Sequence, residues 1–369
     1  MINDANRIVF KFGTNILRNE EGEISLTHMY SFIEDISLLR KKGREVLVVT
    51  SGAVGIGAKK LGVDTSQSNV LKQAAASVGQ QILMRIWQDG FEKYGISVAQ
   101  ILVTEDDFSN RKKYLSLRNT LSKLLELGIV PIINQNDAVL PSELVHVCFS
   151  DNDKLSAIVA SKLDADLLVM VSDIDGLFDK NPKEYPDAKK IDIVEEVNSK
   201  IEKLASGASA GGRGGMVTKL SAAKVVNLSG LYAMIVNGKK PRIIKRIFEE
   251  ENVGTIFLPN KILSHKKRWI AYATNIMGEI TVNAGAKSAL IDKQKSLLAV
   301  GITGVKGDFK AGEIVSIFDE EGGEFARAMV NYSSDECRKI MGAHSHEIEK
   351  ILGYKGDDDV VIKDNLVIL

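Results

Sequence analysis

The first two thirds of the chain alternate short apolar runs with longer stretches in which apolar residues recur at helical spacing. The runs predict strands at Arg7–Phe12, Glu45–Thr50, Ile96–Val103, Ile129–Asn134, Asp166–Val171 and Tyr232–Val236. Helices are predicted between them at Thr27–Lys42, Val70–Tyr94 and Tyr114–Leu127, each followed by a glycine. Near-continuous Val, Ile and Leu runs between helices are typical of a parallel sheet covered on both faces. We therefore predict a doubly wound, mainly parallel α/β domain.

The pattern changes after Pro259. Residues 259–275 are basic and lack clear periodicity, which predicts a linker. Short strands follow at Gly278–Val282, Ser296–Val300, Glu313–Phe318 and Glu324–Val330, with a final pair at Val360–Ile362 and Leu366–Leu369. Two helical pieces, Ser334–Met341 and Ser345–Leu352, precede that pair. The expected organisation is an α/β domain at 1–258, a linker at 259–275 and a small, mostly β domain at 276–369.

Composition places the chain among ordinary globular proteins. At 369 residues, with 44% hydrophobic and 26% charged residues, it is expected to form two domains. No apolar stretch approaches the roughly 18 residues of a membrane span. The N-terminus has no apolar signal region, and Cys148 and Cys337 give neither a disulfide framework nor metal-ligand spacing. We expect a cytoplasmic protein that does not associate with membranes.

Polar side chains follow several of the predicted strands, and a further short apolar run at Leu144–Phe149, at the point where each ends. They are Lys11, Ser51, Asn134, Asp137, Asn152, Asp153, Ser172 and Asp173. Ligands of open α/β sheets bind at the carboxyl ends of the strands. Considered separately, most of these residues are explained by turn formation or helix capping. Lys11 is different, because a lysine in an apolar strand is difficult to solvate, and it indicates a function.

A glycine-rich segment precedes a further predicted helix at Leu220–Leu228. Five glycines fall within residues 207–215, and the run ends Gly-Gly-Met-Val-Thr-Lys at Lys219. Glycine lets backbone N–H groups approach an anion closely, and a helix N-terminus favours negative charge. Neither a Walker A sequence nor a Gly-x-Gly-x-x-Gly motif is present. Taken alone, the segment suits a flexible surface loop as well as a phosphate-binding loop.

Phosphoryl transfer is the chemistry that fits the set. It needs positive charge at the transferred group, a glycine-rich loop and small groups that position the acceptor. Lys11 and Lys219 would supply the charge, and an aspartate between them could hold both. Mg²⁺ would arrive with the nucleotide phosphates, so no dedicated protein metal site is expected. No histidine lies among these motifs, which suits an acceptor that is already ionised, such as a carboxylate.

These motifs resemble those of the glutamate 5-kinases, within the amino acid kinase superfamily. The resemblance is carried by VFKFGTN at 9–15, VTSGAVGIG at 49–57, PIINQNDAV at 131–139, SDNDKLSA at 150–157, SDIDGLF at 172–178 and GGMVTK at 214–219. In the tail it continues with KKRWI at 266–270, GEITVNAGA at 278–286 and HSHEIEKILGY at 344–354. The tail is similar to the PUA domain that bacterial members append to the kinase.

The resemblance implies ATP-dependent phosphorylation of the side-chain carboxylate of L-glutamate, the first step of proline synthesis. It gives Lys11, Lys219 and Asp153 catalytic roles, with Asp153 positioning both lysines. The residues it implies for glutamate binding are Ser51, Asn134, Asp137 and Asn152, with Asp137 at the ammonium group. Those it implies for the nucleotide are Lys11, Ser172, Asp173, Arg213, Gly214, Gly215, Met216, Val217, Thr218 and Lys219. It further implies feedback inhibition by proline, and we expect a homo-oligomer.

Three positions depart from the family pattern. Gln135 stands where an acidic residue is common, Ser172 where threonine is common, and Arg213 where a small residue is common. Gln135 removes a charge beside the expected glutamate site, so glutamate affinity or proline sensitivity could differ.

Two alternatives stay open. One is another acyl-phosphate kinase of the same fold, acting on aspartate, N-acetylglutamate or carbamate. The other is an RNA-binding regulatory protein, because PUA domains bind RNA in other proteins. Residues 276–369 carry 11 Lys and Arg against 16 Asp and Glu, a balance of −5, which argues against RNA.

Overall fold

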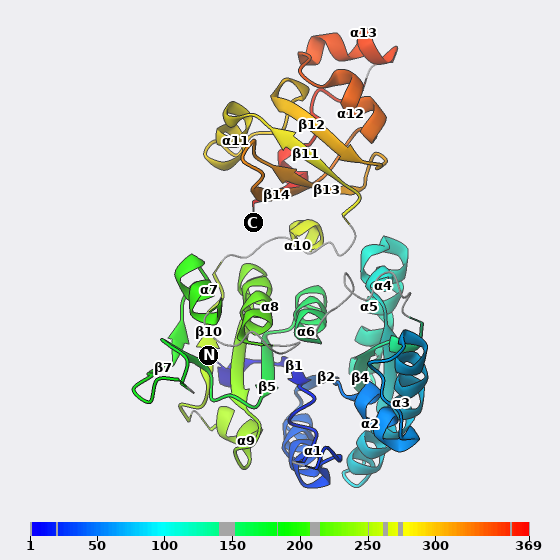
Figure 1. Cartoon of the computed structure of the whole chain (residues 1–369), viewed down its shortest axis with the longest axis vertical. Coiled ribbons are helices and arrows are strands. Elements are labelled where there is room, and N and C mark those ends of the chain that lie inside the picture. Colours follow the sequence, from blue (N-terminus) through cyan, green and yellow to red (C-terminus); the bar gives the residue numbers. More distant parts are fainter. Residues whose placement is uncertain are drawn as a thin grey trace. The chain divides into compact units, whose positions relative to one another are not determined.

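The computed structural model describes residues 2–19, 21–139, 152–182, 184–206, 215–249, 251–260, 265–271, 276–354 and 356–368 (Figure 1). Its contacts divide the chain into two compact units, Met1–Ile262 and Leu263–Leu369. Among the described helices, none combines the length and the hydropathy that a bilayer span requires.

An eight-stranded sheet forms the centre of the first unit. Its strand order is β3-β4-β2-β1-β5-β9-β10-β8. The strands are β1 (Arg7–Phe12), β2 (Glu45–Val49), β3 (Val98–Val103), β4 (Val130–Gln135), β5 (Leu167–Ser172), β8 (Ile193–Val194), β9 (Tyr232–Asn237) and β10 (Thr255–Phe257). Every neighbouring pair from β3 to β9 is parallel, whereas β10 runs antiparallel to β9. The predicted doubly wound, mainly parallel sheet is confirmed.

Helices cover both faces of this sheet (Figure 1). They are α1 (Leu26–Lys41), α2 (Ala53–Leu61), α3 (Asn69–Glu92), α4 (Glu105–Ser109), α5 (Arg111–Glu126), α6 (Asn152–Lys162), α7 (Ser199–Ser206), α8 (Met216–Leu228) and α9 (Ile243–Ile247). A separate two-stranded sheet joins β6 (Leu177–Phe178) to β7 (Lys190–Ile191). The helix expected from Leu220 begins earlier, at Met216, so Lys219 lies in its first turn.

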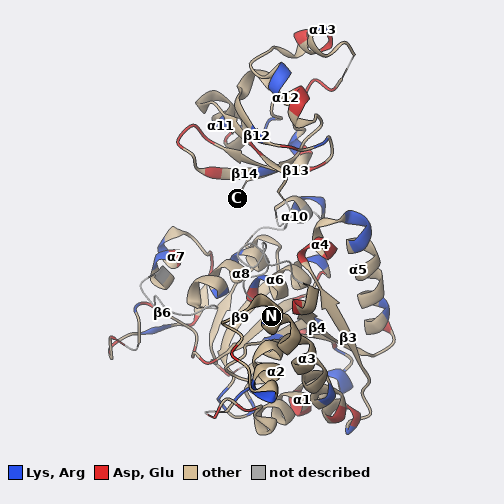
Figure 2. Ribbon diagram, turned by 45° about the vertical axis from the view of Figure 1, so that its right-hand side comes forward, with Lys and Arg blue, Asp and Glu red and all other residues tan. Residues whose placement is uncertain are grey.

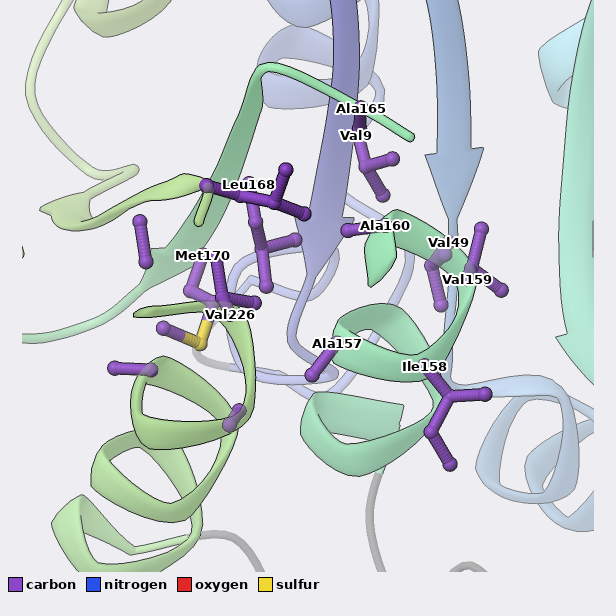
Figure 3. Packing of buried hydrophobic residues seen from close by; sticks show 14 of the residues in the cluster. Val9, Val49, Ala157, Ile158, Val159, Ala160, Ala165, Leu168, Met170 and Val226 are labelled. Carbon is purple, nitrogen blue, oxygen red and sulfur yellow. The ribbon is translucent and has the colours of Figure 1, made fainter. Parts of the chain in front are cut away.

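Strand β1 separates two hydrophobic clusters by the alternation of its side chains. Ile8, Phe10 and Phe12 pack in a cluster with residues of α1, α3 and α9. Val9 packs in the other cluster, with residues of α5, α6, α7 and α8. Figure 3 shows Val9 of β1 among side chains of β5, α6 and α8. Lys11, two residues after Val9, therefore projects toward the face covered by α6 and α8.

Helices α2 and α3 meet backbone to backbone. A Cβ atom built on Gly79 would lie 1.8 Å from the carbonyl oxygen of Ala53, and one built on Gly57 would lie 1.8 Å from that of Ala75. Only glycine permits so close an approach. The contact fixes the start of α2 against the middle of α3, which is the segment that carries Gln80.

The second unit contains a five-stranded sheet with the order β12-β11-β13-β14-β15. The strands are β11 (Gly278–Val282), β12 (Ile302–Gly307), β13 (Ile314–Phe318), β14 (Glu324–Met329) and β15 (Leu366–Ile368). The helices are α10 (His265–Ala271), α11 (Ala284–Ile291), α12 (Ser334–Ile340) and α13 (Ile348–Leu352). Part of the range expected as a linker is thus helical, and Ile270 and Ala271 of α10 pack with Ile314 and Val367.

Two strand predictions in this unit are wrong. Residues 296–300 form no strand: Leu297 makes a single bridge to Val361, and Ala299–Gly301 is a 3₁₀ turn. The predicted pairing of Val360–Ile362 with the last strand is also absent, because β15 pairs with β14. In both places the buried apolar residues pack in the core without forming the strand pairing that the apolar run predicts.

Lys162, the last residue of α6, is 6% exposed. Its Nζ lies 4.6 Å from the centre of the Tyr114 ring and has no hydrogen-bond partner among the described residues. Burial lowers the pKa of Lys162 to about 8. Since the unfolded chain would hold this proton up to pH ~10.4, the charged lysine destabilises the fold most fully below pH 8.

We predict that Gly79→Ala destabilises the first unit by about 1–3 kcal/mol or more, because its methyl group would overlap the carbonyl of Ala53. Chemical unfolding followed by tryptophan fluorescence measures this, since Trp87 is buried in the core. Ser77→Ala introduces the same residue at an exposed position of α3 and should change stability by less than about 0.5 kcal/mol. Equal effects of the two variants would contradict the close helix contact.

We predict that Lys162→Met raises the stability of the first unit at pH 7. The gain is at most about 3 kcal/mol, from the pKa difference of roughly 2.5 units, less the lost attraction to the Tyr114 ring. The advantage should shrink as the pH rises from 8 to 10.5, where the wild-type lysine becomes neutral in both states. Unfolding midpoints across this range test it, and a difference independent of pH would contradict the buried-charge explanation.

Candidate active site

A buried carboxylate bridges two lysines at the carboxyl end of β1. Asp153 Oδ1 lies 2.7 Å from Lys11 Nζ, and Asp153 Oδ2 lies 3.2 Å from Lys219 Nζ. The three side chains come from β1, α6 and α8, and Asp153 is fully buried. Two positive charges against one negative charge leave the trio net positive, which favours an anionic ligand.

The ionised state of Asp153 depends on the lysines. Burial by itself would raise its pKa, but the charges of Lys11 and Lys219 and hydrogen bonds from Lys11 and Thr218 overcome this and hold the pKa below its ordinary value. A buried pair that loses one partner is strongly destabilised, because an uncompensated charge stays in the interior. The trio is therefore a fixed arrangement of charge whose members depend on one another.

The first turn of α8 completes this arrangement. Thr218 Oγ1 lies 2.9 Å from Asp153 Oδ2 and 2.8 Å from the carbonyl oxygen of Gly215, and these two acceptors share its single hydroxyl proton. Gly215 caps the helix without a side chain, so the first backbone N–H groups of α8 keep no side-chain acceptor at the cap. Together with Lys219 in the same turn, they form a site suited to phosphate oxygens.

A chain of amide side chains connects α6 with α3. Asn152 Nδ2 donates to the carbonyl of Thr50 at 2.7 Å and to Asn134 Oδ1 at 3.1 Å. Asn134 Nδ2 donates in turn to Gln80 Oε1 at 2.8 Å. Nearby, Ser51 Oγ donates to the carbonyl of Phe12 at 2.8 Å and accepts from Thr14 at 3.2 Å. The ends of β1, β2 and β4 are thus linked to the N-terminus of α6.

A pocket of about 330 Å³ lies on one side of Lys219. Its polar lining includes Ser172, Asp173 and Lys219, with Gly215 and Met216 from the start of α8. Asn15 Nδ2 donates to Asp173 Oδ2 at 3.1 Å. Burial opposes ionisation of Asp173, but hydrogen bonds from Asn15 and Ser172 lower its pKa on balance. The pocket's size and its mixed lining suit a nucleotide.

A second pocket of about 540 Å³ is lined by Gln80, Gln135, Asn136 and Asp137, with Ala53 at the start of α2. Asp137 opens a short 3₁₀ turn, Asp137–Val139, directly after β4. Burial raises the pKa of Asp137 above its ordinary value, opposed by the charge of Lys72. A partly buried carboxylate among amides can accept hydrogen bonds from an ammonium group.

Most of the residues expected from the sequence converge on these features. Lys11, Asp153, Lys219 and Thr218 form one cluster, and Ser172, Asp173, Gly215 and Met216 line one pocket with Lys219. Val217 does not line that pocket and is 54% exposed. Arg213, Gly214 and the other glycines of the run, at 207–212, lie outside the described residues.

Sequence reasoning missed Gln80 and did not assign Asn15. Asn15 could have been found, because it follows β1 in the same polar run as Lys11. Gln80 belongs to no motif, and only the packing of α3 beside β4 brings it to Asn134. Within the described parts of the chain, no group of three or more His, Cys, Asp or Glu side chains is arranged to hold a metal ion.

Comparison with known proteins places this geometry in a family. The model of the amino acid kinase family matches residues 6–237, and that of the PUA domain matches residues 278–352. The chain is 46% identical to a glutamate 5-kinase of Caldanaerobacter subterraneus subsp. tengcongensis over 98% of each chain. It is 44% identical to a glutamate 5-kinase of Methanosarcina barkeri over 100% of this chain and 98% of that one.

A solved structure supports the same fold. A UMP kinase from Bacillus anthracis is 18% identical and superimposes with a TM-score of 0.50, covering 69% of this chain and 96% of that one. The family model spans well over half of the chain, and the similarity to the first of these relatives extends over 98% of each chain. The chain therefore belongs to the amino acid kinase family.

Proposed function

We propose that the protein transfers the γ-phosphoryl group of ATP to the side-chain carboxylate of L-glutamate, giving L-glutamyl 5-phosphate. The observation that carries the proposal is the Lys11–Asp153–Lys219 trio, which borders a nucleotide-sized pocket through Lys219. Asn152, next to Asp153 in α6, leads through Asn134 to Gln80 in the second pocket. The similarity to glutamate 5-kinases over nearly the whole chain supports this choice of acceptor.

The reaction needs positioned charge and no general base. An oxygen of the ionised carboxylate forms a bond to the γ-phosphorus, the bond from that phosphorus to the β–γ bridging oxygen breaks, and ADP leaves with the electron pair. Lys11 and Lys219 would stabilise the charge of the group in transit, and Asp153 would hold both ammonium groups in place. Because the acceptor is already an anion, no proton has to be removed from it.

The proposed nucleotide contacts lie at the first pocket. Of the proposed glutamate contacts, Asp137 lines the second pocket, and Asn134 lies beside it through its hydrogen bond to Gln80. Ser172, Asp173 and the segment from Gly215 to Lys219 would bind ATP, and the resemblance extends this segment to Arg213 and Gly214. Ser51, Asn134, Asp137 and Asn152 would hold glutamate, with Asp137 facing its ammonium group. Mg²⁺ would be bound mainly by the phosphates of ATP, and it would neutralise part of the phosphate charge.

Further expectations rest on the same proposal. L-proline also carries a carboxylate and an ammonium group, so it could occupy the pocket of Asp137 and act as a feedback inhibitor of proline synthesis. Homo-oligomer formation, a cytoplasmic location and the domain limits 1–258 and 276–369 stay predictions. In Figure 2, acidic and basic segments are interspersed on the ribbon of the second unit. That mixture and the balance of −5 give no support to an RNA-binding role.

Lys219→Met should lower kcat by about 100-fold, because one charged contact to the transferred group is lost. ADP release measured with glutamate, aspartate, N-acetylglutamate and carbamate tests the reaction and its acceptor together. We expect glutamate to be the preferred acceptor, and L-proline to reduce its turnover.

Lys224→Met is the matched control, because Lys224 lies on the same helix but its side chain is 42% exposed and pairs with Glu202. It should retain wild-type turnover. Near-full activity of a folded Lys219→Met variant would disprove the phosphate role of Lys219, and preference for another acceptor would disprove the substrate assignment.

Asp137→Asn should raise the KM for glutamate by roughly 10- to 100-fold, with little effect on the KM for ATP, because the ammonium group loses its counter-charge. In the wild type, the KM for glutamate should rise as the pH falls through the raised pKa of Asp137, at a pH above that of an ordinary aspartate. The variant should lack this rise. The exposed Asp106→Asn is the control, and an unchanged glutamate KM in Asp137→Asn would refute the assignment.

A further inference from the structure

Gln80 presents a buried hydrogen-bond donor that no described residue accepts. Its side chain is 8% exposed and its Oε1 accepts from Asn134 Nδ2. Its Nε2 is buried and has no hydrogen-bond partner among the described residues. Leaving such a donor unsatisfied costs about 1–3 kcal/mol. The donor thus points to an acceptor that a ligand supplies.

A chain of hydrogen bonds that begins at a backbone carbonyl fixes the orientation of the Gln80 amide. The Thr50 carbonyl can only accept, so the group of Asn152 that contacts it must be Nδ2. Asn152 Nδ2 also donates to Asn134, which fixes Oδ1 of Asn134 on that side and turns its Nδ2 toward Gln80. Gln80 must therefore offer Oε1 to Asn134, and its Nε2 is left as a donor.

The surroundings of Gln80 match a zwitterion. Gln80 lines the same pocket as Asp137, an acceptor for an ammonium group, and Ala53, the first residue of α2. Gly52 precedes α2 and has no side chain that could accept from the first N–H groups of this nine-residue helix. The start of α2 therefore also favours a negatively charged group. The contact of Gly79 with the Ala53 carbonyl holds Gln80 beside this helix start. Gln80 and the Asp137 carboxylate thus line one pocket beside the start of α2.

We propose that Gln80 Nε2 donates a hydrogen bond to the α-carboxylate of the acceptor amino acid and makes Gln80 a specificity-determining residue. The inference rests on the proposed function and names a contact within that acceptor site. The α-carboxylate is the partner because the reacting carboxylate must lie at Lys11 and Lys219, whereas Gln80 shares its pocket with Asp137. The pocket therefore selects a free amino acid over one whose α-carboxylate is blocked.

The test compares the binding of L-glutamate with that of its α-amide, L-isoglutamine, by calorimetry. Wild-type protein should bind glutamate roughly 10- to 100-fold more tightly, the value of a hydrogen bond to a charged group. In Gln80→Glu, the new carboxylate still accepts from Asn134 but repels the α-carboxylate. This variant should lose about 100-fold in glutamate affinity, and its preference for glutamate over the α-amide should vanish or reverse.

Two further variants separate a substrate contact from other roles. Gln67→Glu places the same charge on an exposed glutamine just before α3, outside the lining of this pocket, and should keep the wild-type preference. Gln80→Met removes the donor without adding charge and should also lose the preference. If Gln80 served only to hold Asn134, Gln80→Glu would bind like the wild type. That result, or equal losses in Gln80→Glu and Gln67→Glu, would overturn the proposal.

The outcomes also distinguish this inference from the proposed function. Melting temperature and ATP binding identify any variant that fails to fold. If wild-type protein binds glutamate with the expected preference but releases no ADP, the proposed reaction fails and the contact of Gln80 stands. If turnover is normal and Gln80→Glu keeps the preference for glutamate, only the contact of Gln80 is wrong. A wild type that binds neither compound would overturn both.

Discussion

The ion pairs of Asp153 with Lys11 and Lys219 are the constraint on which the site depends. Each lysine comes from a different end of the first unit's sequence, and each is buried at a depth where a single charge is costly. One carboxylate compensates both, which fixes β1, α6 and α8 relative to one another. The same geometry leaves a surplus of positive charge in the interior. Stability and the proposed affinity for phosphate therefore arise from one arrangement.

The sheet prepares this arrangement through the alternation of β1. Phe10 and Phe12 occupy one face, and Val9 and Lys11 the other, so a lysine can enter the interior without disturbing the aromatic side. Asp153 lies at the start of α6, in the turn where a carboxylate is favoured by the helix dipole. Gly215 and Thr218 bring the start of α8 to the same carboxylate. Local preferences of three elements thus agree at one point.

Much of the fold follows from local patterns, since apolar runs between amphipathic helices specify a parallel sheet with little ambiguity. Lys11 could be predicted because it interrupts such a run. The pairing of distant segments is harder to predict. Leu297 and Val361 are both buried, but periodicity along the chain cannot show that they form a single bridge with each other. Gln80 was hidden for the same reason. A single amide side chain in a helix can be recognised as part of the site only when its hydrogen-bond partner from a distant strand, Asn134, is known.

The backbone contact between α2 and α3 has a consequence for protein engineering. With no side chain between Gly57, Gly79 and the opposing carbonyls, the spacing of these helices cannot be tuned by small substitutions. The two helices line the second pocket, proposed to bind the acceptor, and the chemistry of this wall resides in the side chains that they carry. Redesign toward other acceptors would have to substitute side chains such as Gln80 and Asp137, while the backbones of α2 and α3 keep their spacing.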